Sequence, residues 1–172
     1  MEITYLGESS IKIRSKLATF VINPNASIAM TEADAIISFS NDDIDTSKVS
    51  QFRTIISGPG EYEVKGVKIT SAKSGEGIVY KLSMDKLEVT LGKASAISAA
   101  DNVVGAHVVI IETDGLPSDK AITSMQPNVV VLYGGKAKEA AKAIKEGAGE
   151  SINKFVTTFE KLPQEMEVVT LG

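Results

Sequence analysis

The sequence predicts an α/β chain in which helices cover two packed β-sheets. Three observations indicate this class. Short strand-like segments arranged as meanders fill the first half of the chain, strands and helices alternate in the second half, and strands return before the C-terminal end. Because each sheet must bury an apolar face, two sheets packed together with helices outside them satisfy this order. The length suits one domain, which we expect to span residues 1–172.

In the first half, apolar residues alternate or cluster between turn residues, which is typical of half-buried strands. The expected strands are Glu2–Leu6, Ser10–Arg14, Thr19–Ile22, Ala35–Phe39, Thr54–Ser57, Tyr62–Val64, Val67–Ile69, Gly77–Leu82 and Leu87–Leu91. We expect Thr46–Phe52 to form a short helix with Asp45 or Thr46 as its N-cap, since both side chains accept hydrogen bonds from free helical N–H groups.

In the second half, two strands are almost entirely apolar, as expected where both faces of a sheet are covered. The expected elements, in order, are a helix at Ile97–Val104, a strand at His107–Ile111, a helix at Ser118–Met125, a strand at Val129–Leu132, a helix at Lys136–Glu146, and strands at Phe155–Thr158 and Glu167–Leu171. The third helix is rich in alanine and is followed by Gly147, a typical helix stop.

The residue counts exclude several classes of site. The chain has no cysteine, which excludes disulfides, thiolate nucleophiles and sulfur-ligated zinc. Its single histidine, His107, is too few for a histidine-rich zinc site. The net charge of −4, with basic residues spread along the chain, disfavours nucleic-acid binding. We expect a cytoplasmic protein without a membrane partner, because the sequence opens without a signal-peptide pattern and no apolar run approaches about 20 residues.

A polar cluster directly follows the strand Ala35–Phe39 and is the best candidate site. Asp42, Asp43 and Asp45 offer oxygen ligands that suit Mg²⁺, Mn²⁺ or Ca²⁺, although their spacing does not match an EF-hand loop. The alternative is a solvated loop whose aspartates cap the following helix. The residues alone leave both interpretations open.

Several segments together resemble a known family. They are MEITYLGESSIKI, VINP, ADAIIS, SGPGEYEVKGV, IVYKLSMDKLEVTLG and LPQEMEVVTLG, and they occur in the family's order along residues 1–172. The chain is similar to the metallo-β-lactamase superfamily, specifically its small branch around L-ascorbate-6-phosphate lactonase and related zinc-dependent hydrolases. The resemblance implies a four-layer αββα sandwich, with two mixed β-sheets and helices on the outer faces. It also implies a metal site at the rim between the sheets, where zinc turns bound water into a hydroxide nucleophile.

The family's main metal motif, His-x-His-x-Asp-His, follows an apolar strand, and here its histidines are missing. In an ungapped alignment the four ligand positions hold Ser40, Asp42, Ile44 and Asp45. A shift by one residue keeps Asp43 as the motif aspartate, and the histidine positions then hold Phe39, Asn41 and Ile44. Neither register retains a histidine.

The other positions that the resemblance identifies have changed as well. The opening histidine is Glu8, the aspartate before proline is Asn23, the metal-bridging aspartate is Lys93, and the late His-Tyr pair is Leu132-Tyr133. Lys93 places a positive charge where a cation is expected, and we expect it to pair with Glu8, Asp42 or Asp45. The resemblance therefore marks a vestigial site whose candidate residues are Glu8, Asn23, Ser40, Asp42, Asp43, Asp45, Lys93 and Tyr133.

These losses predict a non-catalytic, metal-free protein with no catalytic, cofactor-binding or metal-binding residues. We expect a binding, scaffold or assembly protein that associates with itself or with a related subunit. The family's cofactor is zinc, and we expect no cofactor here. One alternative is a protein that binds a small anionic ligand in the vestigial cleft through Lys93. Another is a hydrolase with a rebuilt, oxygen-only metal site made by Glu8, Asp42, Asp43 and Asp45.

Overall fold

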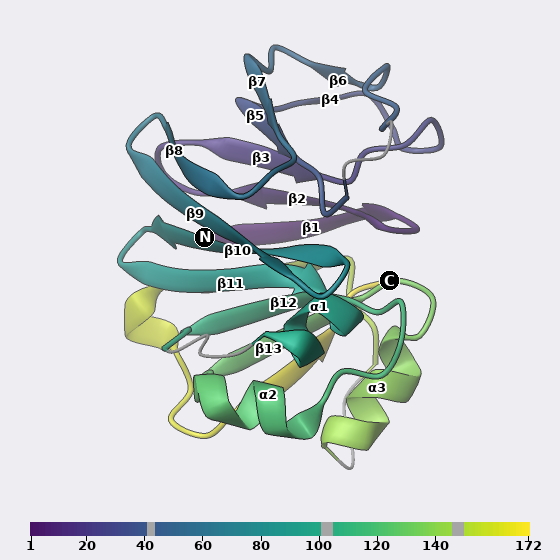
Figure 1. Ribbon diagram of the computed structural model, residues 1–172, viewed down its shortest axis with the longest axis vertical. Helices are drawn as coiled ribbons and strands as arrows, with labels where there is room; N and C mark the ends of the chain where they lie inside the picture. The colour runs from purple at the N-terminus through teal and green to yellow at the C-terminus, as the bar shows by residue number, and fades with distance from the viewer. Residues whose placement is uncertain (41–43, 101–104, 146–149) are drawn as a thin grey trace.

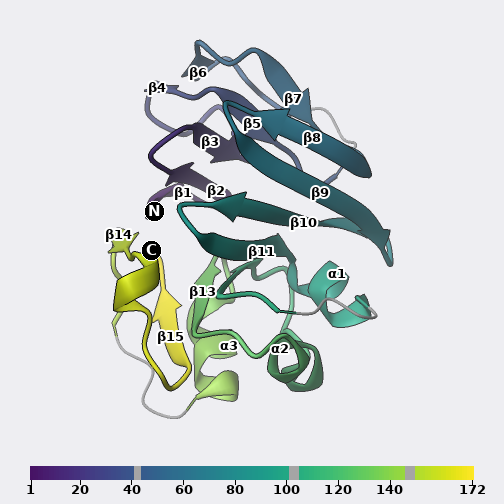
Figure 2. The ribbon, with the colours of Figure 1, turned by 90° about the vertical axis from the view of Figure 1, so that its left-hand side faces the viewer.

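Two mixed β-sheets packed face to face form the centre of the fold (Figures 1 and 2). The computed structural model describes residues 1–40, 44–100, 105–145 and 150–172. Within these residues a further strand pair, β4 (Thr31–Glu32) with β6 (Val49–Ser50), lies outside the two sheets. The predicted sandwich of two mixed sheets is confirmed.

The first sheet combines an antiparallel meander with a parallel half. Its six strands, in spatial order, are β14 (Lys154–Val156), β1 (Glu2–Gly7), β2 (Ser10–Arg14), β3 (Thr19–Ile22), β5 (Ala35–Ile37) and β7 (Thr54–Ile56). Strands β14 to β3 pair antiparallel, whereas β3, β5 and β7 pair in parallel. The carboxyl ends of β1, β3 and β5 therefore lie at the same edge.

The second sheet is arranged in the same two halves. Its seven strands, in spatial order, are β15 (Glu167–Thr170), β13 (Val129–Tyr133), β12 (Val108–Glu112), β11 (Leu87–Lys93), β10 (Gly77–Met84), β9 (Val67–Ser74) and β8 (Gly60–Val64). Strands β8 to β11 form antiparallel hairpins, and β11, β12, β13 and β15 run in parallel. The carboxyl ends of the parallel strands meet at one edge, which is where open α/β sheets bind ligands.

An apolar core fills the space between the two sheets. Ile3, Ile13 and Phe20 from the first sheet face Leu82 and Val89 from the second, and all five side chains are fully buried. Complete burial of such a side chain contributes roughly 1.5–3 kcal/mol to folding. This core holds the two sheet edges in a fixed relation and so positions whatever side chains reach the rim.

The described α-helices cover the outer face of the second sheet (Figure 1). They are α1 (Ala94–Ala99), α2 (Asp119–Met125) and α3 (Ala137–Ile144), and a 3₁₀ turn follows at Phe159–Lys161. The apolar faces of these helices pack on the sheet through Ile97, Ile122 and Ala140. Ser118 caps α2, because its Oγ accepts a hydrogen bond from the N–H of Ala121 at 3.4 Å. None of the described helices is long and apolar enough to cross a membrane.

The outer face of the first sheet has a different cover. Within the described ranges no helix lies on it, and loops with the β4–β6 pair take its place. Val21 and Ile36 from the sheet pack against Ile28 and Val49 from this cover. The expectation of helices on both outer faces is therefore met on one face only.

The helix expected at Thr46–Phe52 is wrong. Residues 47–48 form a turn and the chain then enters β6. The cause is local, because Asp45 Oδ1 accepts a hydrogen bond from the N–H of Ser47 at 2.8 Å. An aspartate bonded to the backbone two residues ahead stabilises a turn, and Val49 gains burial by joining the strand pair.

The contact between α1 and β10 leaves no room for a side chain at Gly77. A Cβ added there would lie 2.9 Å from the Cβ of Ala96. We expect Gly77→Ala to lower the free energy of unfolding by about 1–3 kcal/mol, because neither backbone can move without disturbing the core. Urea unfolding measures this, with Gly115→Ala as the matched control, since nothing lies within 4 Å of a Cβ at that position. Equal stabilities for the two variants would contradict the packing.

Candidate functional site

The candidate site is a cleft of about 320 Å³ at the rim where the two sheets meet. It is lined by Ser9, Asn23, Pro24, Asn25, Ser40, Ile44, Asp45, Lys93 and Glu112. These residues follow the carboxyl ends of β1, β3 and β5 in the first sheet and end β11 and β12 in the second. The cleft therefore lies at the place where the family resemblance puts a metal site.

Strand register brings three polar side chains into a row. Lys93 pairs with Glu112, and Glu112 pairs with Tyr133, at the last residues of β11, β12 and β13. Side chains alternate along a strand, and Leu91 and Ile110, two residues earlier, belong to the core between the sheets. Lys93, Glu112 and Tyr133 therefore point into the sandwich, where the apolar core gives way to the rim.

Asn23 links this row to the first sheet. Its Nδ2 donates a hydrogen bond to Glu112 Oε2 at 2.6 Å, and its Oδ1 accepts one from the N–H of Phe39 at 2.9 Å. The backbone of Asn23 has a φ of 44°, a left-handed conformation that asparagine tolerates better than most residues. The amide nitrogen and oxygen of Asn23 thus connect the ends of β3, β5 and β12.

The surroundings of Glu112 shift the pKa of its carboxyl group in opposite directions. Burial raises the pKa of its carboxyl above the ordinary value, and the charge of nearby Asp114 raises it further. The charge of Lys93 and the hydrogen bond from Asn23 lower the pKa in part. The protonated and ionised forms of Glu112 are therefore closer in free energy than those of a solvated glutamate.

Lys93 does not have the ion-pair partners that the sequence suggested. Among the described residues no carboxylate forms an ion pair with its ammonium, so pairing with Glu8 or Asp45 is wrong. Asp42, the third expected partner, and Asp43 lie outside the described residues. The charge of Lys93 instead acts on Glu112, its neighbour in the strand register.

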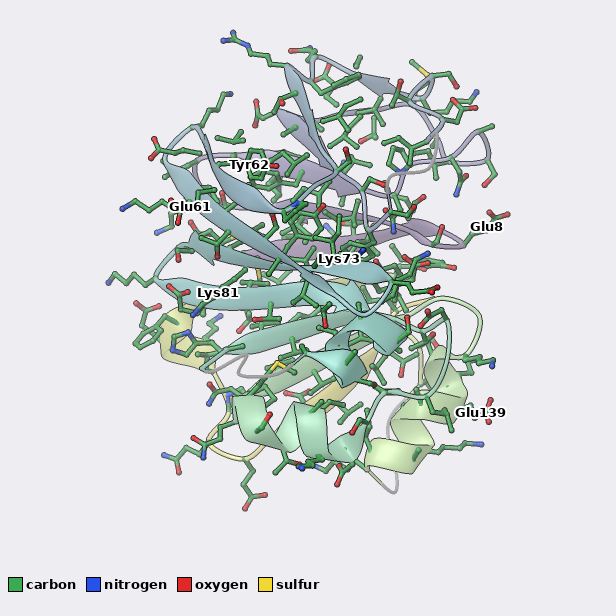
Figure 3. The ribbon with its side chains drawn as sticks, viewed as in Figure 1. Glu8, Glu61, Tyr62, Lys73, Lys81 and Glu139 are labelled. Atoms are coloured by element: carbon green, nitrogen blue, oxygen red, sulfur yellow. The ribbon has the colours of Figure 1, made fainter. Side chains whose placement is uncertain are left out.

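The other expected residues lie around the cleft with separate roles. Glu8 is exposed in the turn between β1 and β2, and Figure 3 shows it projecting from the edge of the molecule. Ser40 lines the cleft, and its carbonyl accepts a hydrogen bond from Ser38 Oγ at 2.7 Å. Asp45 is exposed at the cleft's edge, and its hydrogen bonds from Ser47 hold the pKa of its carboxyl below the ordinary value.

Tyr133 is fully buried, and its hydroxyl has no hydrogen-bond partner among the described residues. Burial raises the pKa of this hydroxyl well above its usual range, and the nearby charge of Glu112 adds to the rise. Tyr80, equally buried, differs because its hydroxyl donates to the carbonyl of Ser38 at 2.6 Å. Tyr133 therefore contributes packing and an unsatisfied polar atom, and it remains protonated.

The described side chains do not fit a zinc ion. No three histidine, aspartate or glutamate side chains within the described residues gather closely enough to hold a metal. His107 is used elsewhere, where its Nδ1 accepts a hydrogen bond from the N–H of Glu88 at 2.9 Å and its ring packs edge-on against Phe159. Zinc prefers nitrogen, sulfur and carboxylate ligands in a tetrahedron, whereas the described lining of the cleft offers two carboxylates, Glu112 and Asp45, together with the ammonium of Lys93.

Glu112 is the charged residue of the cleft that the sequence analysis missed. It directly follows the apolar run Val108–Ile111 and ends a buried parallel strand. A carboxylate at the end of an apolar strand is the sequence signal that could have identified Glu112, because the carboxyl ends of parallel strands meet at a common edge. The expected strand ended one residue too early, at Ile111, and so left Glu112 in a loop.

Solved structures share the two-sheet sandwich of this chain. No protein-family profile and no curated protein sequence matches the chain. A candidate Zn-dependent hydrolase of the metallo-β-lactamase superfamily from Thermotoga maritima matches with a TM-score of 0.77 and 21% identity, over 99% of this chain and 98% of that one.

Two further structures have the same fold. A candidate metal-dependent hydrolase from Parabacteroides distasonis gives a TM-score of 0.62 at 13% identity, covering 99% of this chain and 93% of its own. An isothiocyanate hydrolase from Delia radicum gut bacteria gives 0.60 at 9% identity, covering 92% and 99%. At these identities the likeness shows the fold alone: this chain has the metallo-β-lactamase fold.

The two buried tyrosines predict opposite effects of removing a hydroxyl. We expect Tyr133→Phe to raise the free energy of unfolding by about 1 kcal/mol, because it removes a buried oxygen without a described partner. Tyr80→Phe should lower it by about 1 kcal/mol, because a hydrogen bond to Ser38 is lost. Chemical denaturation of the two variants in parallel measures both. A comparable loss in both would show that the Tyr133 hydroxyl has a partner.

Glu112→Gln predicts a stability difference that depends on pH. Because the folded pKa of Glu112 is raised, its stabilising contribution is present at low pH and is lost as pH rises through the raised pKa. Glutamine keeps an acceptor for Asn23 but does not titrate. The stability of the variant relative to the parent should therefore increase from pH 4 towards neutral pH.

Denaturant unfolding between about pH 4 and pH 8 measures this difference. Glu139→Gln is the control, because Glu139 is exposed on α3 (Figure 3). A relative stability of Glu112→Gln that falls as pH rises would show that the carboxylate is held as an ion instead.

Proposed function

We propose that this protein is a non-catalytic, metal-free binding protein built on the metallo-β-lactamase fold. Similar solved structures are described as hydrolases, so the fold alone would suggest hydrolysis. The observation that carries the proposal is Lys93, which lines the rim cleft beside Glu112.

A lysine at this position opposes a divalent cation. Two unit charges about 5 Å apart interact by roughly 3 kcal/mol at an effective dielectric constant of 20, and a divalent ion doubles this repulsion. The half-buried carboxylate of the cleft, Glu112, is already bonded to Asn23 and faces the charge of Lys93. The polar groups at the rim thus stabilise each other in the place where a metal would have to bind.

The cleft itself supports a binding role. It combines a cation, carboxylates, amides and hydroxyls on the ends of rigid strands, and small-molecule sites have the same composition of a few convergent polar groups. We also propose that the protein associates with a second copy of itself or with a related subunit.

Zinc titration by calorimetry tests the metal-free state. We expect the chelator-treated protein to bind zinc no more tightly than about 100 μM, and Lys93→Asp to bind at least about tenfold more tightly, because attraction replaces repulsion. Lys136→Asp is the matched control, since it makes the same charge change at the start of α3, away from the cleft.

Micromolar zinc binding by the parent protein, lost in Glu112→Gln, would overturn the proposal. The same titrations with Mg²⁺ and Mn²⁺ test an oxygen-only metal site. We also expect no hydrolysis of phosphodiester, lactone or β-lactam substrates, with or without these metals.

A further inference from the structure

The charges of the cleft do not suit a simple anion. Lys93 is the one cationic side chain among the described lining residues, whereas Glu112 and Asp45 are carboxylic acids. The hydrogen bonds from Ser47 favour the ionised form of Asp45. A free anion attracted by Lys93 would therefore share the cleft with two carboxyl groups that repel it when ionised.

The hydrogen-bonding positions that Glu112 and Lys93 leave unused favour a ligand that carries both a positive and a negative charge. Glu112 Oε2 accepts the hydrogen bond from Asn23, which leaves Oε1 without a donor among the described residues. Lys93 likewise has no described carboxylate partner and retains donors for an acceptor in the cleft. A half-buried carboxylate and a nearby ammonium in this state complement an ammonium and a carboxylate carried by one small molecule.

We propose that the rim cleft binds a small zwitterion, of the class of free α-amino acids, with its ammonium group at Glu112 and its carboxylate at Lys93. Asn25 and Ser9 line the same cleft and offer further polar groups to the ligand. This inference rests on the metal-free function proposed above, because a zinc ion would occupy the same rim.

The size of the cleft agrees with this class of ligand. About 320 Å³ lies at the small end of ligand sites, which range from roughly 300 to 1,000 Å³. A nucleotide or a peptide needs a larger surface. Pro24 and Ile44 provide the apolar part of the lining, where the side chain of an amino acid would lie.

An NMR titration of the ¹⁵N-labelled 172-residue chain tests the inference. The probe is an equimolar pool of the twenty standard L-amino acids, each at up to about 10 mM, followed by single amino acids. We expect shifts of the backbone amides of Asn25, Lys93 and Glu112. The amine and the α-hydroxy acid that match the best amino acid each lack one charge, and we expect both to bind at least about tenfold more weakly.

Variants locate the site on the protein. Lys93→Gln and Glu112→Gln should each weaken binding at least about tenfold, whereas Lys136→Gln and Glu139→Gln, which make the same changes at exposed positions of the α3 region, should leave it unchanged. The dispersion of the NMR spectrum shows that each variant is folded.

Two outcomes would overturn the inference: no shift with any amino acid, or equal binding of the α-hydroxy acid, which would make the cleft an anion site. The zinc titration separates this failure from failure of the proposed function. Zinc binding at the rim would contradict the proposed metal-free function. An amino-acid titration that shifts no amide signal, in a protein that also binds no zinc, would contradict only the proposed ligand.

Discussion

The packing of two sheets with their parallel strand ends at a common rim is the constraint on which the rest of the structure depends. The core between the sheets fixes the strand register, and the register places Lys93, Glu112 and Tyr133 side by side. Asn23 then joins the row to the first sheet through its bond to Glu112. The family resemblance implies metal ligands at this rim, where the structure has a lysine and a glutamate whose carboxylate is bonded to an amide.

The sequence predicts the sheets well because their patterns are strong. Ser10–Arg14 and Thr19–Ile22 have the predicted bounds, and the apolar strands around Ile110 and Val131 are buried on both faces as expected. The helix at Thr46–Phe52 failed because a short polar segment gives no periodic pattern, and an aspartate turn with a pairing strand decided its structure.

The candidate site was predicted in part. The family resemblance identified Asn23, Ser40, Asp45 and Lys93, which line one cleft, although their distances in the sequence give no sign of it. Glu112 was missed, because the residue beside Lys93 in the sheet is set by the register of β11 and β12, and neither segment alone shows that register. The expected ion pairs with Glu8 and Asp45 failed for the same reason, since both residues are exposed on loops of the other sheet.

The claim that Lys93 and Glu112 have taken the place of a metal is tested most directly by zinc-edge anomalous diffraction. Crystals grown with excess zinc should show no anomalous peak in the rim cleft, with the Asn23 amide still bonded to Glu112. A zinc peak within about 2.2 Å of a Glu112 or Asp45 oxygen would contradict the account, because that is the distance of a zinc–carboxylate bond.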